Sequence, residues 1–426
     1  MGGLFFTGKN LRWLMLVLAA FALASGCSAG REQSSTADSN AGAKATSRAE
    51  APAGSSSEAR KDSASSPPKG DKAPGGASGG YRQNQIQSGQ LTAGEWSDLR
   101  HWDWWLNLMN NREWAQYQEK WDMRTYQRVT VEVKTDNGPA VDAQVTLFGG
   151  SGQQEWSART NNKGEAFLFV NVAKKQEDSP YSLKIAYGQQ TKTVEQVAVN
   201  GGLPLVVNVP GDGKQPDAID LMFVVDTTGS MADELNFLAA ELKDVVARVK
   251  SENDNRLSVR LSSNFYRDRG DEYVVRPFPF TADVDEVVKQ IGRQKAQGGG
   301  DYEEAVEEAL QDAIDKHNWS GSARARLLFL VLDAPPHPNP DVIGKLQKVT
   351  ASAAEKGIRI IPVASSGVDK NTEMLLRTID ILTGGTYIFL TDHSGIGDKH
   401  IEPTIGDYQV ELLNRLLVKT INSYIQ

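Results

Sequence analysis

Two apolar runs, each followed by an aspartate, constrain the fold of this chain more than any other sequence feature. Ile219–Val225 precedes Asp226, and Arg326–Leu332 precedes Asp333. Runs with hardly any polar residue are typical of strands buried on both faces, as in a parallel sheet covered by helices. The carboxyl ends of such strands meet at one edge of the sheet, where open α/β proteins bind their ligands. We therefore expect both aspartates at a ligand site.

Strand and helix patterns alternate over residues 217–426. Further strands are expected at Leu257–Tyr266, Ile358–Val363 and Thr386–Leu390, and helices at Met231–Val249, Tyr302–His317, Asp341–Lys356, Thr372–Leu382 and Asp407–Ser423. This alternation predicts an α/β fold, Rossmann-like, with a largely parallel central sheet flanked by helices.

Residues 127–210 show a different periodicity. Six or seven short segments alternate apolar and polar residues, which predicts a small all-β sandwich. Its stretches Gly138–Leu147 and Thr160–Gly164 resemble the carboxypeptidase regulatory-like or transthyretin-like module. That resemblance implies a spacer or docking module without catalytic residues.

Residues 91–126 are rich in tryptophan. Large side chains recur there at helical spacing: Trp96, Leu99, Trp102, Trp105 and Met109, and then Trp114, Tyr117 and Trp121. The spacing predicts a short helical hairpin. Its rings either cover a neighbouring domain or form an exposed surface for a partner.

The first 27 residues are expected to be a targeting signal that is not part of the folded protein. The apolar run Leu14–Ala24 follows two basic residues and is too short to be read as a membrane-spanning helix. It leads into Ala24-Ser-Gly-Cys27, which resembles a bacterial lipobox. The resemblance implies a lipoprotein signal peptide over 1–27 and a lipid attached to Cys27, so that the mature chain is extracytoplasmic and anchored to the bacterial cell envelope. Ordinary secretion is the alternative, because Ala22-Leu-Ala24 also fits a signal-peptidase site.

A tether is predicted over residues 28–90. Between positions 28 and 80 there is no Val, Ile, Leu, Met, Phe, Trp or Tyr, and Ser, Ala, Gly and Pro dominate. Such a composition buries too little apolar surface to offset the entropy of ordering the chain. We expect this segment to be disordered and to hold the folded part away from the membrane.

The composition excludes several classes of function. Lys and Arg number 46 against 54 Asp and Glu, a net charge of −8, whereas nucleic-acid binding depends on a basic surface. A single cysteine excludes a disulfide framework and a thiolate zinc site.

Three loops of the C-terminal part resemble those of the von Willebrand factor type A domain. They are Asp226-Thr-Thr-Gly-Ser230, Gly298-Gly-Gly-Asp301 and the stretch that runs from Leu330 through Asp333 to His337. The resemblance implies a metal-ion-dependent adhesion site with Asp226, Thr228, Ser230, Asp301 and Asp333 as its metal-binding residues. Asp301 stands where the family more often has threonine, so it either ligates directly or through water.

Oxygen ligands of this kind suit Mg²⁺, Ca²⁺ or Mn²⁺. A cation that protein groups leave incompletely coordinated can accept a carboxylate from a protein ligand. We therefore expect a surface-tethered, cation-dependent binding protein for adhesion or assembly, with no catalytic residues. Two alternatives stay open: an aspartyl-phosphate phosphatase that uses Asp226 as its nucleophile, and a purely structural envelope protein. The loop residues could also merely cap helices.

Overall fold

The computed structural model describes residues 86–173, 179–200, 203–253 and 256–426. Cys27 and nearly all of the predicted tether lie outside the described residues. None of the described helices is long and apolar enough to cross a membrane.

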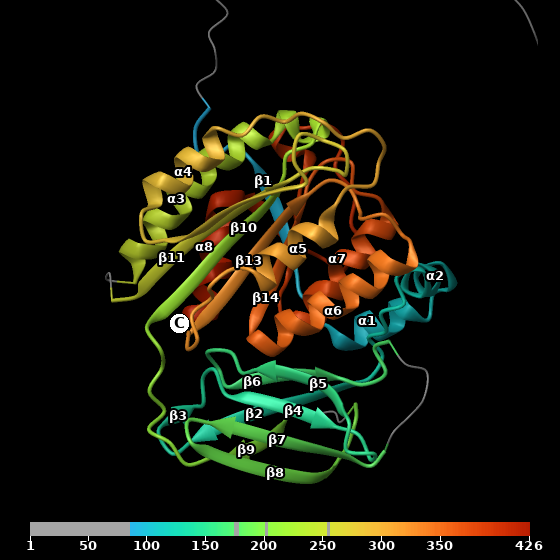
Figure 1. The fold of residues 1–426 in the computed structure, drawn as a ribbon, viewed down its shortest axis with the longest axis vertical. Helices are drawn as coiled ribbons and strands as arrows, with labels where there is room; N and C mark the ends of the chain where they lie inside the picture. The colour runs from blue at the N-terminus through green and yellow to red at the C-terminus, as the bar shows by residue number, and fades with distance from the viewer. Residues whose placement is uncertain (1–85, 174–178, 201–202, 254–255) are drawn as a thin grey trace, which may run out of the picture. The chain divides into compact units, whose positions relative to one another are not determined.

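A mostly parallel sheet forms the centre of the α/β part (Figure 1). In the described residues its strand order is β12-β11-β10-β13-β14-β15-β1-β16. The parallel strands are β10 (Ala218–Asp226), β11 (Ser258–Tyr266), β13 (Ala325–Leu332), β14 (Ile358–Ala364) and β15 (Tyr387–Leu390). The antiparallel additions are β12 (Val275–Thr281), β1 (Thr92–Trp96) and β16 (Glu411–Leu412). The predicted α/β fold with a largely parallel central sheet is confirmed.

Helices cover both faces of this sheet. One face packs against α3 (Leu235–Glu252), α4 (Val284–Gly292) and α8 (Leu413–Ile425), and the other against α5 (Val306–Asp315), α6 (Pro340–Lys356) and α7 (Lys370–Thr383). Successive side chains of β10 alternate between these two cores: Phe223 packs with the first group and Val224 with the second. Two-sided burial explains why the strand is almost wholly apolar.

Glycines at the ends of two helices turn the chain back into the sheet. Gly357 ends α6 with φ 69°, and Gly384 ends α7 with φ 77°. This left-handed backbone region favours glycine, which carries no Cβ. Each turn leads directly into the next parallel strand.

The first part of the tryptophan-rich segment is a strand, whereas the spacing predicted a helix that included Trp96. β1 pairs with β15, a partner about 290 residues away in the sequence, and Trp96 lies opposite Tyr387. The buried carboxylate of Glu241 in α3 accepts hydrogen bonds from the backbone N–H groups of Gly89, Gln90 and Leu91. These tertiary hydrogen bonds override the local helical pattern. Because β1 belongs to the central sheet, the chain between β1 and β10 is an insertion into the α/β unit, which therefore begins before residue 217.

The remaining tryptophans of the tryptophan-rich segment lie on α1 (Trp102–Met109) and α2 (Arg112–Trp121). Trp105, Trp114 and Trp121 are buried. The guanidinium of Arg377 in α7 lies 5.1–5.4 Å from the ring centroids of Trp104, Trp105 and Trp114. These rings cover α7, and Asp98 holds the same guanidinium with two hydrogen bonds of 2.8 and 2.7 Å.

The chain between α2 and β10 forms two small sheets. One contains β2 (Arg128–Thr135), β3 (Gly138–Pro139), β6 (Glu165–Phe169) and β9 (Leu205–Asn208), and the other β4 (Gln144–Phe148), β5 (Gln154–Arg159), β7 (Tyr181–Tyr187) and β8 (Gln190–Val197). Alternate side chains of both sheets, such as Val131, Val145 and Leu183, are fully buried in one shared apolar core.

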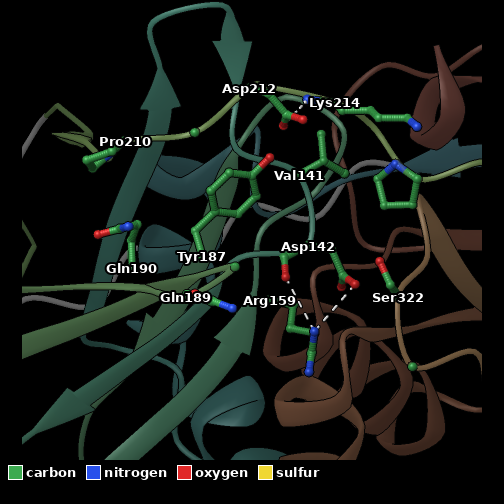
Figure 2. Close-up of a pocket in the computed structure, with 14 residues that line it drawn as sticks. Val141, Asp142, Arg159, Tyr187, Gln189, Gln190, Pro210, Asp212, Lys214 and Ser322 are labelled. Carbon is green, nitrogen blue, oxygen red and sulfur yellow. Dashed lines mark hydrogen bonds and ion pairs between the residues drawn. The ribbon is translucent and has the colours of Figure 1, made fainter.

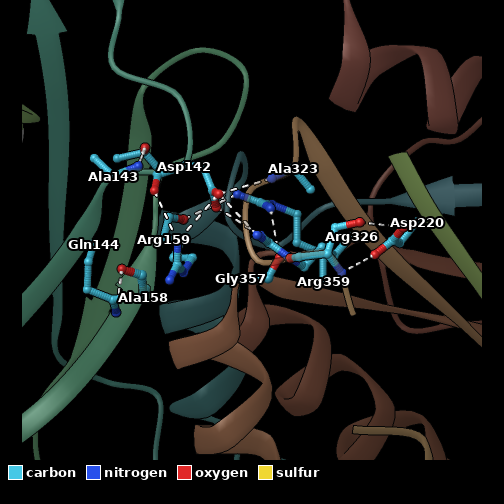
Figure 3. A network of polar contacts seen from close by, with 12 residues as sticks. Asp142, Ala143, Gln144, Ala158, Arg159, Asp220, Ala323, Arg326, Gly357 and Arg359 are labelled. Atoms are coloured by element: carbon cyan, nitrogen blue, oxygen red, sulfur yellow. Dashed lines mark hydrogen bonds and ion pairs between the residues drawn. The ribbon is translucent and has the colours of Figure 1, made fainter. Parts of the chain in front are cut away.

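A buried ion pair joins these sheets to the α/β part (Figure 3). Asp142 accepts hydrogen bonds of 2.8 and 3.0 Å from the two terminal nitrogens of Arg326, and the backbone N–H of Ala323 donates to it at 3.1 Å. The side chains of Asp142 and Arg326 are only 6% and 3% exposed. Arg326 lies near the start of β13, so the contact leaves the carboxyl ends of the parallel strands uncovered by the small sheets.

Replacing Asp142 should therefore destabilise the fold. We expect Asp142→Ala to lower the free energy of unfolding by about 3 kcal/mol, because it leaves the Arg326 guanidinium buried without its carboxylate. Urea unfolding of the full chain, followed by circular dichroism, measures this. Asp136→Ala, at an exposed turn of the same sheets, is the matched control. Equal stability of the two variants would show that the Asp142–Arg326 ion pair does not stabilise the fold.

Candidate functional site

The predicted site residues Asp226, Thr228 and Ser230 lie together where β10 ends. Thr228 donates two hydrogen bonds to Oδ1 of Asp226, from its backbone N–H at 2.8 Å and its hydroxyl at 2.7 Å. The hydroxyl oxygens of Thr228 and Ser230 are 3.2 Å apart. Asp226 and Thr228 are buried, whereas Ser230 is exposed at the start of the short 3-10 helix Gly229–Asp233. The loop thus presents oxygen atoms from the interior out to the surface.

Asp333 follows β13, which is the neighbour of β10, and its side chain is also buried. Burial first, and then the Asp333 carboxylate, raise the pKa of Asp226 to about 7. Oδ2 of Asp226 is buried and forms no hydrogen bond of regular geometry among the described residues, although the buried Tyr266 hydroxyl lies close enough to lower the pKa of Asp226. Two carboxylates in a dry environment repel each other unless a proton or a cation lies between them.

Glu304 is a third buried carboxylate that the predicted ligand set did not include. Its residue is 3% exposed, and its Oε2 has no hydrogen-bond partner among the described residues. Burial, followed by the charges of Asp226, Asp268 and Asp333, raises its pKa to about 9. In the sequence, the one feature that could have indicated its burial is its position directly before the apolar residues Ala305 and Val306 at the start of a helical pattern.

The glycine-rich loop lies directly against these groups. Gly229 N–H donates to Gly298 O at 3.2 Å, and Gly299 N–H donates to Oδ2 of Asp271 at 2.9 Å. A Cβ on Gly299 would lie only 2.9 Å from Oε1 of Glu304 and 3.4 Å from Cβ of Thr228. Glycine is therefore required where the loop passes between these side chains.

Asp301 is exposed, and its carboxylate groups with side chains that the predicted ligand set did not include. Its carboxylate, that of Asp268 and a ring nitrogen of His337 lie within 4.8 Å of one another. No other group of three such ligands meets that criterion in the described part of the chain. Two positive-φ glycines, Gly298 and Gly299, set the path of the loop to Asp301. The structure therefore brings four of the five predicted residues to the ends of β10 and β13 and places the fifth beside His337.

The arginine that follows Asp268 in the sequence forms its ion pairs with acidic residues outside this site. Arg269 pairs with Glu307 and Glu308 on α5. Among the described residues, no Lys or Arg forms an ion pair with Asp226 or Glu304. Within the described part of the chain, Asp226 and Glu304 are therefore buried carboxylates without a Lys or Arg counter-ion.

A cavity of about 520 Å³ lies far from these loops in the fold (Figure 2). It is lined by residues of the small sheets and by the connection to β10, including Tyr187, Asp212 and Lys214. Its charged pair, Asp142 and Arg159, is already joined by an ion pair of 3.4 Å. The cavity contains none of the predicted site residues.

Comparison with known proteins identifies the domain that carries the site. Residues 220–395 match the von Willebrand factor A domain. This part of the chain is a von Willebrand factor A domain. The match includes all three predicted loops and excludes the small sheets and the tryptophan-rich segment.

The chain is also similar to a putative ariadne-like RING finger protein, R811, of Acanthamoeba polyphaga mimivirus. The two are 30% identical over 121 residues. The aligned stretch is 28% of this chain and 11% of the viral protein, so the chain spans only about a tenth of that relative's length.

Domains of this family often bind a divalent cation, and the residues present fit one. Asp226, Asp333 and Glu304 supply hard carboxylate oxygens, and Thr228 and Ser230 supply hydroxyls. A bound cation would satisfy the buried Oδ2 of Asp226, which forms no hydrogen bond of regular geometry among the described residues.

Burial of these carboxylates, together with the repulsion between them, predicts a pH-dependent stability in EDTA. The folded pKa of Asp226 is about 7 and its ordinary value 3.8, so the folded state holds a proton that the unfolded chain has lost. The free energy of unfolding should therefore fall as pH rises from about 4 to 7, by roughly 2–4 kcal/mol. Glu304 extends this fall to higher pH.

The variant Asp226→Asn tests this directly. It removes one ionisable group and should flatten the loss of stability between pH 5 and 8, while it makes the cation-free fold more stable at pH 8. Urea unfolding at both pH values measures it, with the exposed Asp136→Asn as control. The same pH dependence in both variants would show that Asp226 is ionised in the folded protein.

Proposed function

We propose that this protein is an extracytoplasmic, lipid-anchored binding protein whose von Willebrand factor A domain holds a divalent cation and uses it to capture a protein ligand. One observation carries the proposal: the carboxylates of Asp226 and Asp333 are buried and interact at the carboxyl end of the sheet, and Oδ2 of Asp226 forms no hydrogen bond of regular geometry among the described residues. A cation is the chemical group that relieves such a site.

The proposed cation ligands are Asp226, Thr228, Ser230 and Asp333, with Glu304 close by. Carboxylate and hydroxyl oxygens favour Mg²⁺, Ca²⁺ or Mn²⁺. In this assignment the cation offsets both the burial and the Asp333 charge that raise the pKa of Asp226. Its binding therefore stabilises the folded state.

Exposure around the site supports capture of a partner. Ser230, Gly300 and Asp301 are exposed, and the ring of Tyr302 is 41% exposed. A cation bound by the buried Asp226 and the exposed Ser230 would be accessible from this surface. An acidic side chain of a protein ligand is the group that can complete its coordination there.

The phosphatase alternative is less well supported. A nucleophilic aspartate must reach its substrate, but Asp226 is fully buried and its Oδ1 already accepts two hydrogen bonds from Thr228. We therefore propose a binding role and no enzymatic one. The small sheets, fixed at the opposite end of β13, are proposed to act as a spacer or docking module.

Cation dependence is the main test of the proposal. Asp226→Ala should abolish Mg²⁺ binding in calorimetry, together with EDTA-sensitive capture of envelope proteins, while the fold remains. Asp136→Ala should change neither. Failure of the wild-type chain to bind Mg²⁺, Mn²⁺ or Ca²⁺ at millimolar concentration would overturn the proposal. Cation binding without any EDTA-sensitive capture would favour the structural alternative.

Anchoring is a separate prediction, which concerns a residue outside the described part of the chain. Cys27→Ala should move the protein from the membrane fraction to the soluble fraction, because its lipid is the proposed anchor. Fractionation followed by immunoblotting measures this, and Ser28→Ala is the matched control. A Cys27→Ala variant that still fractionates with membranes would refute the lipoprotein assignment.

A further inference from the structure

We propose that Asp268, Asp301 and His337 form a second divalent-cation site, next to the first, that selects a transition ion such as Mn²⁺ or Zn²⁺. The ligand atoms of the three residues lie within 4.8 Å of one another. They come from three separate segments, namely the loop after β11, the glycine-rich loop and the loop after β13. This site uses residues other than Asp226, Thr228, Ser230 and Asp333 and does not require that the first site captures a partner.

The surrounding side chains leave this group rich in negative charge. His337 Nε2 lies 3.1 Å from Oδ1 of Asp268. The arginines on either side of Asp268 bind elsewhere: Arg269 pairs with Glu307 and Glu308, and Arg267 donates to the backbone oxygen of Lys295. Two carboxylates thus face one imidazole, with neither neighbouring guanidinium as a counter-ion.

Asp271 arranges the group in space. Its Oδ2 accepts hydrogen bonds from the backbone N–H of Asp268 at 3.2 Å and from that of Gly299 at 2.9 Å. One carboxylate therefore ties the loop after β11 to the glycine-rich loop. This bridge holds Asp268 close to Asp301, so the ligands are brought together before any ion binds.

Glu304 supplies an independent sign of a missing ligand. Its Oε2 is buried and has no hydrogen-bond partner among the described residues. Its backbone N–H donates to Pro335 O at 2.9 Å, and the residue forms a parallel bridge with Pro336, which directly precedes His337. On its other side, Oε1 of Glu304 and Cβ of Thr228 lie against the same glycine, Gly299, whose Cβ would be 2.9 Å from the first and 3.4 Å from the second. The unpartnered carboxylate therefore lies beside both groups of ligands.

The donor set distinguishes this site from the first. Asp226, Thr228, Ser230 and Asp333 offer only oxygen, which suits Mg²⁺ or Ca²⁺. An imidazole nitrogen with two carboxylates favours an ion that accepts both donor types, and Zn²⁺ and Mn²⁺ do so. Mg²⁺ binds imidazole poorly, so the two sites should differ in their selectivity.

The experiment titrates the purified full chain with Mn²⁺, Zn²⁺ or Mg²⁺ alone, by calorimetry and, for Mn²⁺, by electron paramagnetic resonance. The wild-type chain should bind two Mn²⁺ ions. His337→Gln should remove one of them and weaken Zn²⁺ binding about 10-fold or more, with Mg²⁺ binding unchanged. Asp226→Asn should have the opposite effect, losing Mg²⁺ and keeping Zn²⁺.

Two further variants make the result unambiguous. His393→Gln, at an exposed position, is the matched histidine control and should bind like the wild type. Asp301→Asn alters the same site at an exposed loop residue, so that misfolding cannot account for its effect, and it should also lose the Zn²⁺ ion. Unchanged Zn²⁺ binding in His337→Gln and Asp301→Asn would overturn the proposal. So would a single Mn²⁺ ion that both Asp226→Asn and His337→Gln abolish, which would indicate one shared site.

Discussion

The parallel pairing of β10 with β13 is the constraint on which the rest of the structure depends. It aligns the two strands residue by residue, from Ile219 opposite Ala325 to Val225 opposite Val331. Both strands then end together, and Asp226 and Asp333 leave the sheet at the same edge. Burial on both faces gives the pair the dry surroundings in which like charges interact strongly. The chemistry of the site therefore follows from a strand register.

The carboxylates at this edge cost the fold stability when no cation is bound. Asp226 and Glu304 have raised pKa values because burial and neighbouring charges oppose their ionisation. The two apolar cores on either face of the sheet offset this cost. The same buried carboxylates that destabilise the cation-free protein would be stabilised by a bound cation. Groups with such perturbed pKa values are common at functional sites.

The insertion between β1 and β10 contacts the α/β unit at the end of β13 that is opposite the candidate site. The small sheets contact the α/β unit through Asp142 and Arg326, near the beginning of β13. Glu241 holds the backbone that leads into β1, close to the point where the described part of the chain begins. The Asp142–Arg326 contact lies at the opposite end of β13 from the candidate site, whereas the chain enters β1 at the carboxyl edge of the sheet, where Ala93 pairs with Leu390 at the end of β15.

The sequence alone determined those features that depend on neighbouring residues. Nearly continuous apolar runs are typical of strands that are buried on both faces, so the parallel sheet and the location of Asp226 and Asp333 at its edge could be predicted. Thr228 and Ser230 follow Asp226 so closely that the tight turn places their hydroxyls near its carboxylate. Tertiary structure decided the rest, because those features depend on segments far apart in the chain. Trp96 lies in a strand because β15 and Glu241 satisfy the backbone of its segment, and this outweighs the helical spacing of the tryptophans. Glu304 lies near Asp226, and Asp301 near His337, because the glycine-rich loop packs against two other loops, a path that no local pattern encodes.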